Sequence, residues 1–196
     1  MPGSAIATDR PFVPLRLAGK AWTTKALAVL LGTLFLAASS WIAVPMFPVP
    51  MTMQTLAVTL VGALYGWRLG LATVLAWLGE AALGLPVLAN GAGGLAPFVG
   101  PTAGYLASFP IAAAFVGFVA ERGWTARGRL LSSVTVMLLA NLFILIFGTL
   151  VLGGVLRMSL SGAYAAGFAP FIVGGILKSA LATASIEGLS RSKIPS

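Results

Sequence analysis

Long apolar runs are the feature that most limits what this chain can fold into. Six of them follow one another, at residues 25–44, 53–67, 71–85, 102–119, 130–155 and 167–189. A helix needs roughly 20 predominantly apolar residues to cross a bilayer, or about 17 at the short end. Only 8% of the residues are charged, whereas soluble domains carry about 25%. The sequence therefore predicts an all-α integral membrane protein with six transmembrane helices.

The segments between the runs contain residues that interrupt a helix. Pro45, Pro48 and Pro50 rule out a regular helix between the first and second runs. The second run is short, so it is either a steep helix or one that begins below the membrane surface. Arg68 and Gly70 are predicted to form a tight turn into the third run, and a chargeless, glycine-rich loop follows that run.

Lysine and arginine residues determine the predicted orientation, because cytoplasmic segments retain them. With the N-terminus inside, the inner side holds Arg10, Arg16, Lys20, Lys25, Arg68, Arg122, Arg127, Arg129, Arg191 and Lys193. The outer segments hold Arg157, and Lys178 lies within a run. We therefore expect both termini in the cytoplasm, a basic tail at 1–24, a six-helix membrane domain at 25–190 and a short tail at 191–196. The first tail lacks the apolar core of a signal peptide, and a bacterial inner membrane is the expected location.

Composition excludes several classes of function. The chain has no cysteine and no histidine, which removes disulfides, thiol catalysis and the commonest metal ligand. The net charge is +8, but the basic residues lie between apolar runs. This arrangement favours a role of these residues in orienting the chain in the membrane over nucleic-acid binding. It contains no G-x-x-x-x-G-K-[ST] loop, so a partner protein would have to bind and hydrolyse ATP if transport is driven by ATP. We expect no cofactor and no metal ion.

Two ionisable residues, Lys178 and Glu80, lie well inside apolar runs. Lys178 is about 11 residues into the last run, near the bilayer centre, where a charged side chain indicates a functional site by default. The alternative is that its ammonium group reaches the membrane interface. Glu80 is an acid inside the third run, and we predict that it partly neutralises Lys178 across an outward-facing cavity if the two helices are neighbours. Neither residue belongs to a nucleophile and base arrangement, so an enzyme is not expected.

Other polar and aromatic side chains gather near the outer ends of the runs. They are Thr52, Gln54, Thr55, Trp77, Asn90 and Tyr105. Together they suit a small, partly polar ligand. Asn141, within the fifth run, is predicted to make an interhelical hydrogen bond. Ala28 and Gly32, four residues apart, form a small-residue face that allows helices to approach closely.

Three stretches carry a resemblance to a known family. The first is residues 49–56 (VPMTMQTL), continuing to 62–66 (GALYG). The second is residues 84–89 (GLPVLA), followed by 100–106 (GPTAGYL) and by Phe109 and Pro110. The third is Gly167 with residues 170–178 (PFIVGGILK). In this order and spacing they resemble the BioY family, the biotin-specific substrate-binding (S) components of energy-coupling-factor (ECF) transporters. The resemblance covers about residues 26 to 190.

This resemblance implies a six-helix bundle that captures biotin near its outer face and transports it inward. A membrane coupling subunit and two ATPases would drive release, or the chain would work without a dedicated module, for example by self-association. The face around Ala28 and Gly32 would dock the coupling subunit. Lys178 matches the family's lysine, whereas Gly175 stands where the family usually has an aspartate, so one polar contact is missing or has moved. The candidate ligand-binding residues are Lys178, Asn90, Gln54, Thr52, Tyr105, Trp77, Glu80 and Gly175, with Glu80 or Asn90 expected to receive the ureido N–H groups.

Two alternatives to biotin uptake remain open from the sequence. Gly175 is also consistent with an S component for another vitamin or precursor. A structural or assembly membrane protein, whose polar residues only join helices, is the alternative from a different class. Identification of the bound ligand separates the first from biotin uptake, and saturable uptake or tight ligand binding would reject the second.

Overall fold

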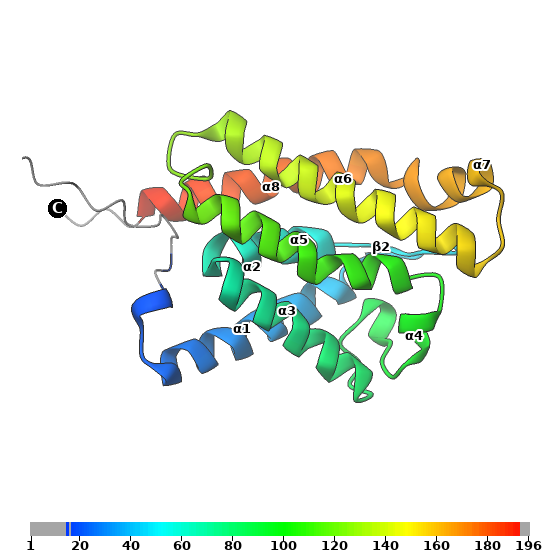
Figure 1. Ribbon diagram of the computed structural model, residues 1–196, viewed down its shortest axis with the longest axis horizontal. Helices are drawn as coiled ribbons and strands as arrows, with labels where there is room; N and C mark the ends of the chain where they lie inside the picture. The colour runs from blue at the N-terminus through cyan, green and yellow to red at the C-terminus, as the bar shows by residue number, and fades with distance from the viewer. Residues whose placement is uncertain (1–14, 16, 193–196) are drawn as a thin grey trace, which may run out of the picture.

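Helices make up most of the computed structural model, which describes residues 15 and 17–192 (Figure 1). The longer helices of this part are α1 (Trp22–Trp41), α2 (Gln54–Tyr65), α3 (Trp67–Ala82), α5 (Ala103–Glu121), α6 (Leu130–Val155) and α8 (Phe171–Ser192). The shorter elements are η1 (Leu17–Gly19), β1 (Ala43–Val44), β2 (Met51–Thr52), η2 (Ala89–Gly91), α4 (Ala96–Val99), α7 (Leu160–Ala163) and η3 (Tyr164–Phe168). Each predicted apolar run therefore corresponds to one longer helix.

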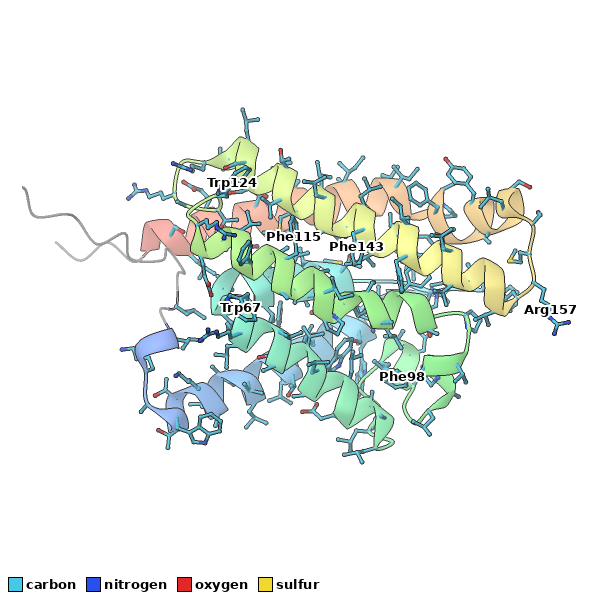
Figure 2. All side chains as sticks on the ribbon, in the orientation of Figure 1. Trp67, Phe98, Phe115, Trp124, Phe143 and Arg157 are labelled. Atoms are coloured by element: carbon cyan, nitrogen blue, oxygen red, sulfur yellow. The ribbon has the colours of Figure 1, made fainter. Side chains whose placement is uncertain are left out.

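Four of these helices, α1, α5, α6 and α8, are long and apolar enough to cross a membrane. Their outward faces carry large apolar side chains that water would not solvate well, including Leu34 of α1 and Val173 of α8. Phe115 of α5 and Phe143 of α6 are two more, and both are labelled in Figure 2. Such faces are expected to contact the hydrocarbon chains of the lipid instead of water. The chain is a multi-pass membrane protein.

The bundle is organised around α5. This helix packs against α6 on one side and against α2 and α3 on the other, while α8 packs against α6 and α2, and α1 covers α3 and α2. Close approach of α2 and α5 depends on Gly62, where an added Cβ would overlap the backbone of Ala113. In Figure 1, α1 begins and α8 ends at one end of the bundle, whereas β2, α4 and α7 lie toward the other.

The turn between α2 and α3 differs from the predicted one. It lies at Gly66, whose φ of 81° is unfavourable for other residues, and α3 begins at Trp67 instead of after Gly70. The side chain of Glu121, at the end of α5, accepts a hydrogen bond from the backbone N–H of Trp67 (3.1 Å). This long-range contact satisfies one of the free N–H groups at the start of α3, so the helix starts earlier than its apolar run.

A short hairpin follows α1, where the three prolines were predicted to prevent a helix. Its strands β1 and β2 are antiparallel, with Ala43 opposite Thr52 and Val44 opposite Met51. The hairpin is joined to α1 by Gln54, whose Nε2 donates to Ser40 Oγ (3.0 Å). Pairing of the hairpin therefore fixes the position of the Thr52 carbonyl group, which faces the interior of the bundle.

The predicted tails are mostly outside the described residues. Arg10, Arg16 and Lys193 lie there, so the boundaries at 1–24 and 191–196 stay predictions. In the described part, α1 already begins at Trp22 and α8 continues to Ser192. The start of the last run falls within the π-helical turn η3, so α8 itself starts at Phe171 and not at Gly167.

Candidate ligand-binding site

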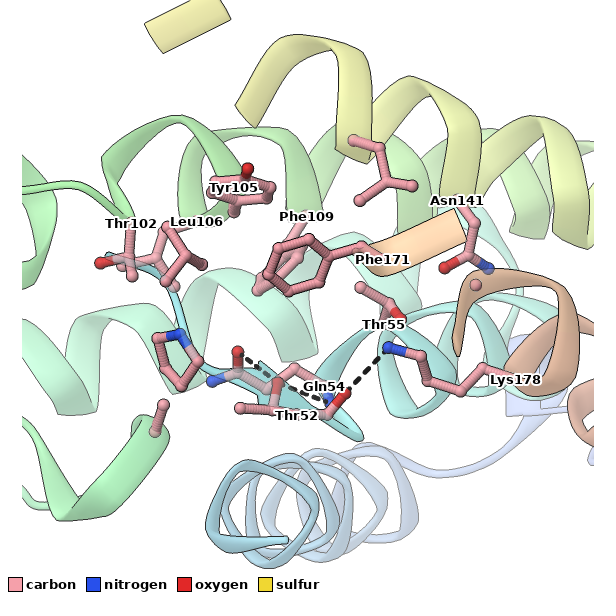
Figure 3. A pocket seen from close by; sticks show the side chains of 15 residues that line it. Thr52, Gln54, Thr55, Thr102, Tyr105, Leu106, Phe109, Asn141, Phe171 and Lys178 are labelled. Carbon is pink, nitrogen blue, oxygen red and sulfur yellow. Dashed lines mark hydrogen bonds between the residues drawn. The ribbon is translucent and has the colours of Figure 1, made fainter. Parts of the chain in front are cut away.

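A narrow cavity lies between the hairpin, α2, α5, α6 and α8 (Figure 3). Its walls are mainly apolar and aromatic, with Leu106, Phe109, Leu145 and Phe171 among them. Its polar lining comprises Thr52, Gln54, Thr55, Thr102, Tyr105, Asn141 and Lys178. Apolar walls with a few convergent polar groups are typical of small-molecule sites.

Lys178 is the charged residue of the cavity lining. Its side chain is 8% exposed, and its Nζ donates to the carbonyl oxygen of Thr52 (2.9 Å). An ammonium group has three N–H donors, and Thr52 is the partner that the described part of the chain provides. The remaining donors are available to a ligand that carries a carbonyl or carboxylate group.

The predicted pairing of Glu80 with Lys178 is wrong in this structure. Within the described residues no ion pair joins them, and Glu80 is outside the cavity lining. The reason is the order of the helices: α3 packs against α1, α2 and α5, whereas α8 packs against α2 and α6. Helices α3 and α8 therefore share α2 as a neighbour and do not pack closely against each other.

Gln54 and Tyr105 line the cavity, as predicted, but their polar ends are already bonded. Gln54 Oε1 accepts from Thr52 Oγ1 (3.0 Å), and its Nε2 donates to Ser40. Tyr105 donates from its hydroxyl to the carbonyl oxygen of Gly167 (2.7 Å), and its ring faces that of Phe171 at 6.3 Å. Both residues therefore shape the cavity walls and connect them to α1 and η3.

Trp77 and Asn90 lie outside the lining. Trp77 is fully buried, stacks on Phe109 with ring centroids 6.1 Å apart, and donates from Nε1 to the carbonyl oxygen of Val87 (3.0 Å). It supports the Phe109 wall from behind and holds the loop after α3. Asn90 is exposed, with a φ of 56°, and only its neighbour Ala89 reaches the lining.

Thr55 and Asn141 both line the cavity, although neither was among the candidate ligand-binding residues predicted from the sequence. The Oγ1 atom of Thr55 is buried and has no hydrogen-bond partner among the described residues. Asn141 makes the predicted interhelical bond, from Nδ2 to Ser179 Oγ (3.0 Å), but it also lines the cavity beside Gly175. The contact of α6 with α8 brings them together, and no spacing in the sequence reveals that register.

The small-residue face of α1 is occupied by the chain itself. Tyr65 donates from its hydroxyl to the carbonyl oxygen of Ala28 (2.8 Å). Gly32 is buried, and an added Cβ would overlap Thr73 and crowd the Tyr65 ring. These residues do allow close helix approach, as predicted, and the helices are α2 and α3 of the same chain. Gly32 is buried by this packing, whereas Ala28 is half-buried, and the docking of a partner on this face stays a prediction.

Comparison with known proteins places this bundle in a family. The family model described as "BioY family" matches residues 11–194, nearly the whole chain. The chain belongs to the BioY family. The resemblance seen in the three sequence stretches is thereby confirmed.

Individual relatives and a solved structure agree with this assignment. The biotin transporter BioY of Rhodobacter capsulatus is 51% identical over 82 residues, 41% of this chain and 43% of the relative. That of Thermotoga maritima is 39% identical over 90 residues, 46% and 53% of the two chains. The matched stretches thus span about half the length of these curated relatives.

The structural match extends further along the chain. The crystal structure of the S-component for biotin from an ECF-type ABC transporter superposes with a TM-score of 0.77 at 25% identity. The match covers 88% of this chain and 95% of that one. The fold described above is therefore that of an ECF S-component.

Proposed function

We propose that this chain captures biotin in the cavity and takes it up across the membrane. The observation that carries the proposal is Lys178, a buried cation whose described partner is one backbone carbonyl group. Burying a charge without a counter-charge is costly, and an anionic or carbonyl-bearing ligand would offset that cost. The relatives named as biotin transporters and the S-component for biotin indicate which ligand.

The chemistry of biotin matches the lining. Its sulfur-containing ring is apolar and can pack against the aromatic wall formed by Phe109 and Phe171. Its ureido group offers two N–H donors and a carbonyl acceptor, and its valerate chain ends in a carboxylate. Lys178 is suited to donate to the carbonyl oxygen or to the carboxylate.

Orientation in the membrane follows from the positions of the cations. Figure 2 shows Arg157 at one end of the bundle and Trp67 and Trp124 at the other, close in sequence to Arg68 and Arg122. The cation-rich end would be cytoplasmic, which gives six spans, both termini inside and the hairpin toward the outer face. Helices α2 and α3, with 12 and 16 residues, would span roughly 18 and 24 Å, less than the bilayer core, beside the hairpin and the loop that follows α3.

Energy for uptake would come from partner proteins. This chain has no phosphate-binding loop of its own, and the matching fold is that of a component of an ECF-type ABC transporter. We propose that a membrane coupling subunit and its ATPases drive release into the cytoplasm of a bacterial cell. The docking surface around Ala28 and Gly32 of α1 stays part of this proposal, with Ala28 half-buried and Gly32 covered by α2 and α3.

Calorimetric titration of the purified protein with biotin tests the proposal. We expect one-to-one binding that Lys178→Ala weakens by about 100-fold, as removal of a charged hydrogen-bond partner in a buried site does. Lys25→Ala, the same substitution at the start of α1, should bind as wild type does. Absence of biotin binding by folded protein would contradict the proposal and direct attention to another vitamin, which Gly175 in place of the family's aspartate keeps as the second candidate.

A further inference from the structure

The polar atoms of the cavity differ in whether their hydrogen bonds are already made. Gln54 and Tyr105 have used theirs within the protein. Among the described residues, both polar atoms of the Gln54 amide thus make a hydrogen bond, whereas in Asn141 only the nitrogen does. Its Nδ2 donates to the carbonyl oxygen of Met137 (3.0 Å) and to Ser179 Oγ (3.0 Å), whereas no described residue donates to its Oδ1.

The orientation of the Asn141 amide is set by its neighbours. The carbonyl group of Met137 can only accept a hydrogen bond, so it must face the NH₂ side of the amide. Ser179 donates its hydroxyl hydrogen to the carbonyl oxygen of Gly175 (2.8 Å) and so presents a lone pair to Asn141. A rotated amide would place its oxygen against both of these acceptors. The Oδ1 atom is therefore held on the side away from Ser179.

That side is the cavity. Asn141 is 4% exposed and lines the cavity together with Gly175 and Lys178, and Figure 3 shows its carbonyl oxygen turned toward the side on which Phe171 and Thr55 lie. No neighbouring side chain fills the position of Gly175, since a Cβ there would find only Leu145 Cδ1 within 4 Å, at 3.9 Å. Gly175 and Asn141 thus both lie on an open part of the lining.

A polar atom of Thr55 in the same cavity is buried and also lacks a partner within the described part of the chain. The hydroxyl group of Thr55, on α2, has no hydrogen bond among the described residues. Buried polar groups are nearly always hydrogen-bonded, and leaving one unpaired is costly. Two unpaired polar atoms lining one cavity are best explained by a ligand that bonds to them.

We propose that Asn141 is a specificity-determining residue, whose Oδ1 accepts a hydrogen bond from an N–H group of the ligand's cyclic urea. The inference rests on biotin, or a related cyclic urea, being the ligand. Asn141 then supplies from α6 the acceptor that Gly175 does not supply from α8. Thr55 Oγ1 is the second polar contact. A ligand whose ring nitrogen is methylated at this end would be rejected, because it would leave Oδ1 buried and unpaired.

Affinity measurements on matched variants test this role. We expect Asn141→Leu, which is similar in size and has no acceptor, to weaken biotin binding by about 10- to 100-fold. Ser133→Ala also removes a buried polar group from α6 but lies outside the lining, and it should bind as wild type does. Ring N-methylated biotin should bind wild type much more weakly than biotin, and Asn141→Leu should discriminate less between the two.

The outcomes separate this inference from the proposed function. If wild type binds biotin and Asn141→Leu binds it equally well, the inference is overturned and biotin capture stands. If folded wild type binds no biotin, the proposed function fails and the inference fails with it.

A second measurement needs no variant of Asn141, should Asn141→Leu not fold. The chain has two asparagines, Asn90 and Asn141, so ¹⁵N-asparagine labelling gives two side-chain amide signals. Asn90→Gly, which suits the positive φ at that exposed position, identifies which signal is which. Biotin should shift the Asn141 amide signal and leave that of Asn90 in place. An unmoved Asn141 signal in protein saturated with biotin would overturn the inference.

Discussion

Two walls of the cavity differ in what their polar groups do. On the hairpin wall, formed by Thr52 and Gln54, the side chains bond to each other and to Ser40 of α1. On the α6–α8 wall, formed by Asn141, Gly175 and Lys178, an amide oxygen and an ammonium group keep unfilled bonding capacity. A polar residue can therefore line a cavity without being a ligand contact. The hairpin wall holds the shape of the site, and the α6–α8 wall offers the open groups.

The largest effect on stability should come from breaking the hairpin wall. We expect Gln54→Leu to lower the free energy of unfolding by about 2–4 kcal/mol, because the buried hydroxyl groups of Ser40 and Thr52 would each lose a partner. Thermal unfolding in detergent measures this change, and Lys178→Ala is the comparison that should lose biotin with a smaller change in stability. A Gln54→Leu protein as stable as wild type that no longer binds biotin would show that the hairpin wall contacts the ligand.

Trp77 tests the supporting layer behind the cavity. Trp77→Phe keeps a ring against Phe109 but removes the donor to the carbonyl oxygen of Val87, so the free energy of unfolding should fall by about 1–3 kcal/mol. Biotin affinity of the folded variant should stay within about threefold of wild type, because a shape-supporting residue outside the lining contributes little binding energy. A loss of affinity beyond tenfold with unchanged thermal stability would place Trp77 in contact with the ligand.

Substitution of Thr55 should lower biotin affinity without lowering stability, the reverse of the result expected for Trp77. Thr55→Val replaces a buried, unpaired hydroxyl group with a methyl group, so the free energy of unfolding without ligand should stay the same or rise by up to about 1 kcal/mol. Biotin affinity should fall about tenfold, because the ligand loses one hydrogen bond. Thermal unfolding with and without biotin measures both quantities. Unchanged affinity would restrict the open polar groups to the α6–α8 wall.

The smallest effect is expected for Glu80. Glu80→Gln should change the free energy of unfolding by less than about 0.5 kcal/mol, as substitutions away from buried partners usually do, and should leave biotin affinity unchanged. The same titration measures it beside Asn141→Leu. A clear loss of affinity would show that α3 approaches Lys178 in a conformation different from the present one.

The helices were largely predictable because apolar runs and helix-breaking residues are local signals. The run at 130–155 coincides with α6, and the prolines before residue 52 do interrupt the chain. The start of α3 was not predictable from local sequence, because Glu121, far along the chain, bonds to Trp67. The pairing of β1 with β2 was also missed, since strands of two residues carry no periodic pattern.

The residue types of the site were predictable from the sequence, but which helices pack next to one another was not. Lys178, Tyr105 and Gly175 do line one cavity, as an ionisable residue within a span and the family resemblance indicated. The predicted pairing of Glu80 with Lys178 was wrong, because the apolar pattern of a helix does not determine which other helices it packs against. The helices that pack against Gly32 were not predictable for a related reason: a small residue indicates close packing but does not say which helix packs there.

A structure determined with biotin bound would show which wall of the cavity contacts the ligand. We expect the polar atoms of biotin to contact Lys178 Nζ, Asn141 Oδ1 and Thr55 Oγ1, while Gln54 keeps its bonds to Thr52 and Ser40. Biotin bonded instead to Gln54 or Trp77, with Asn141 Oδ1 still unpaired, would contradict the distinction between the two walls.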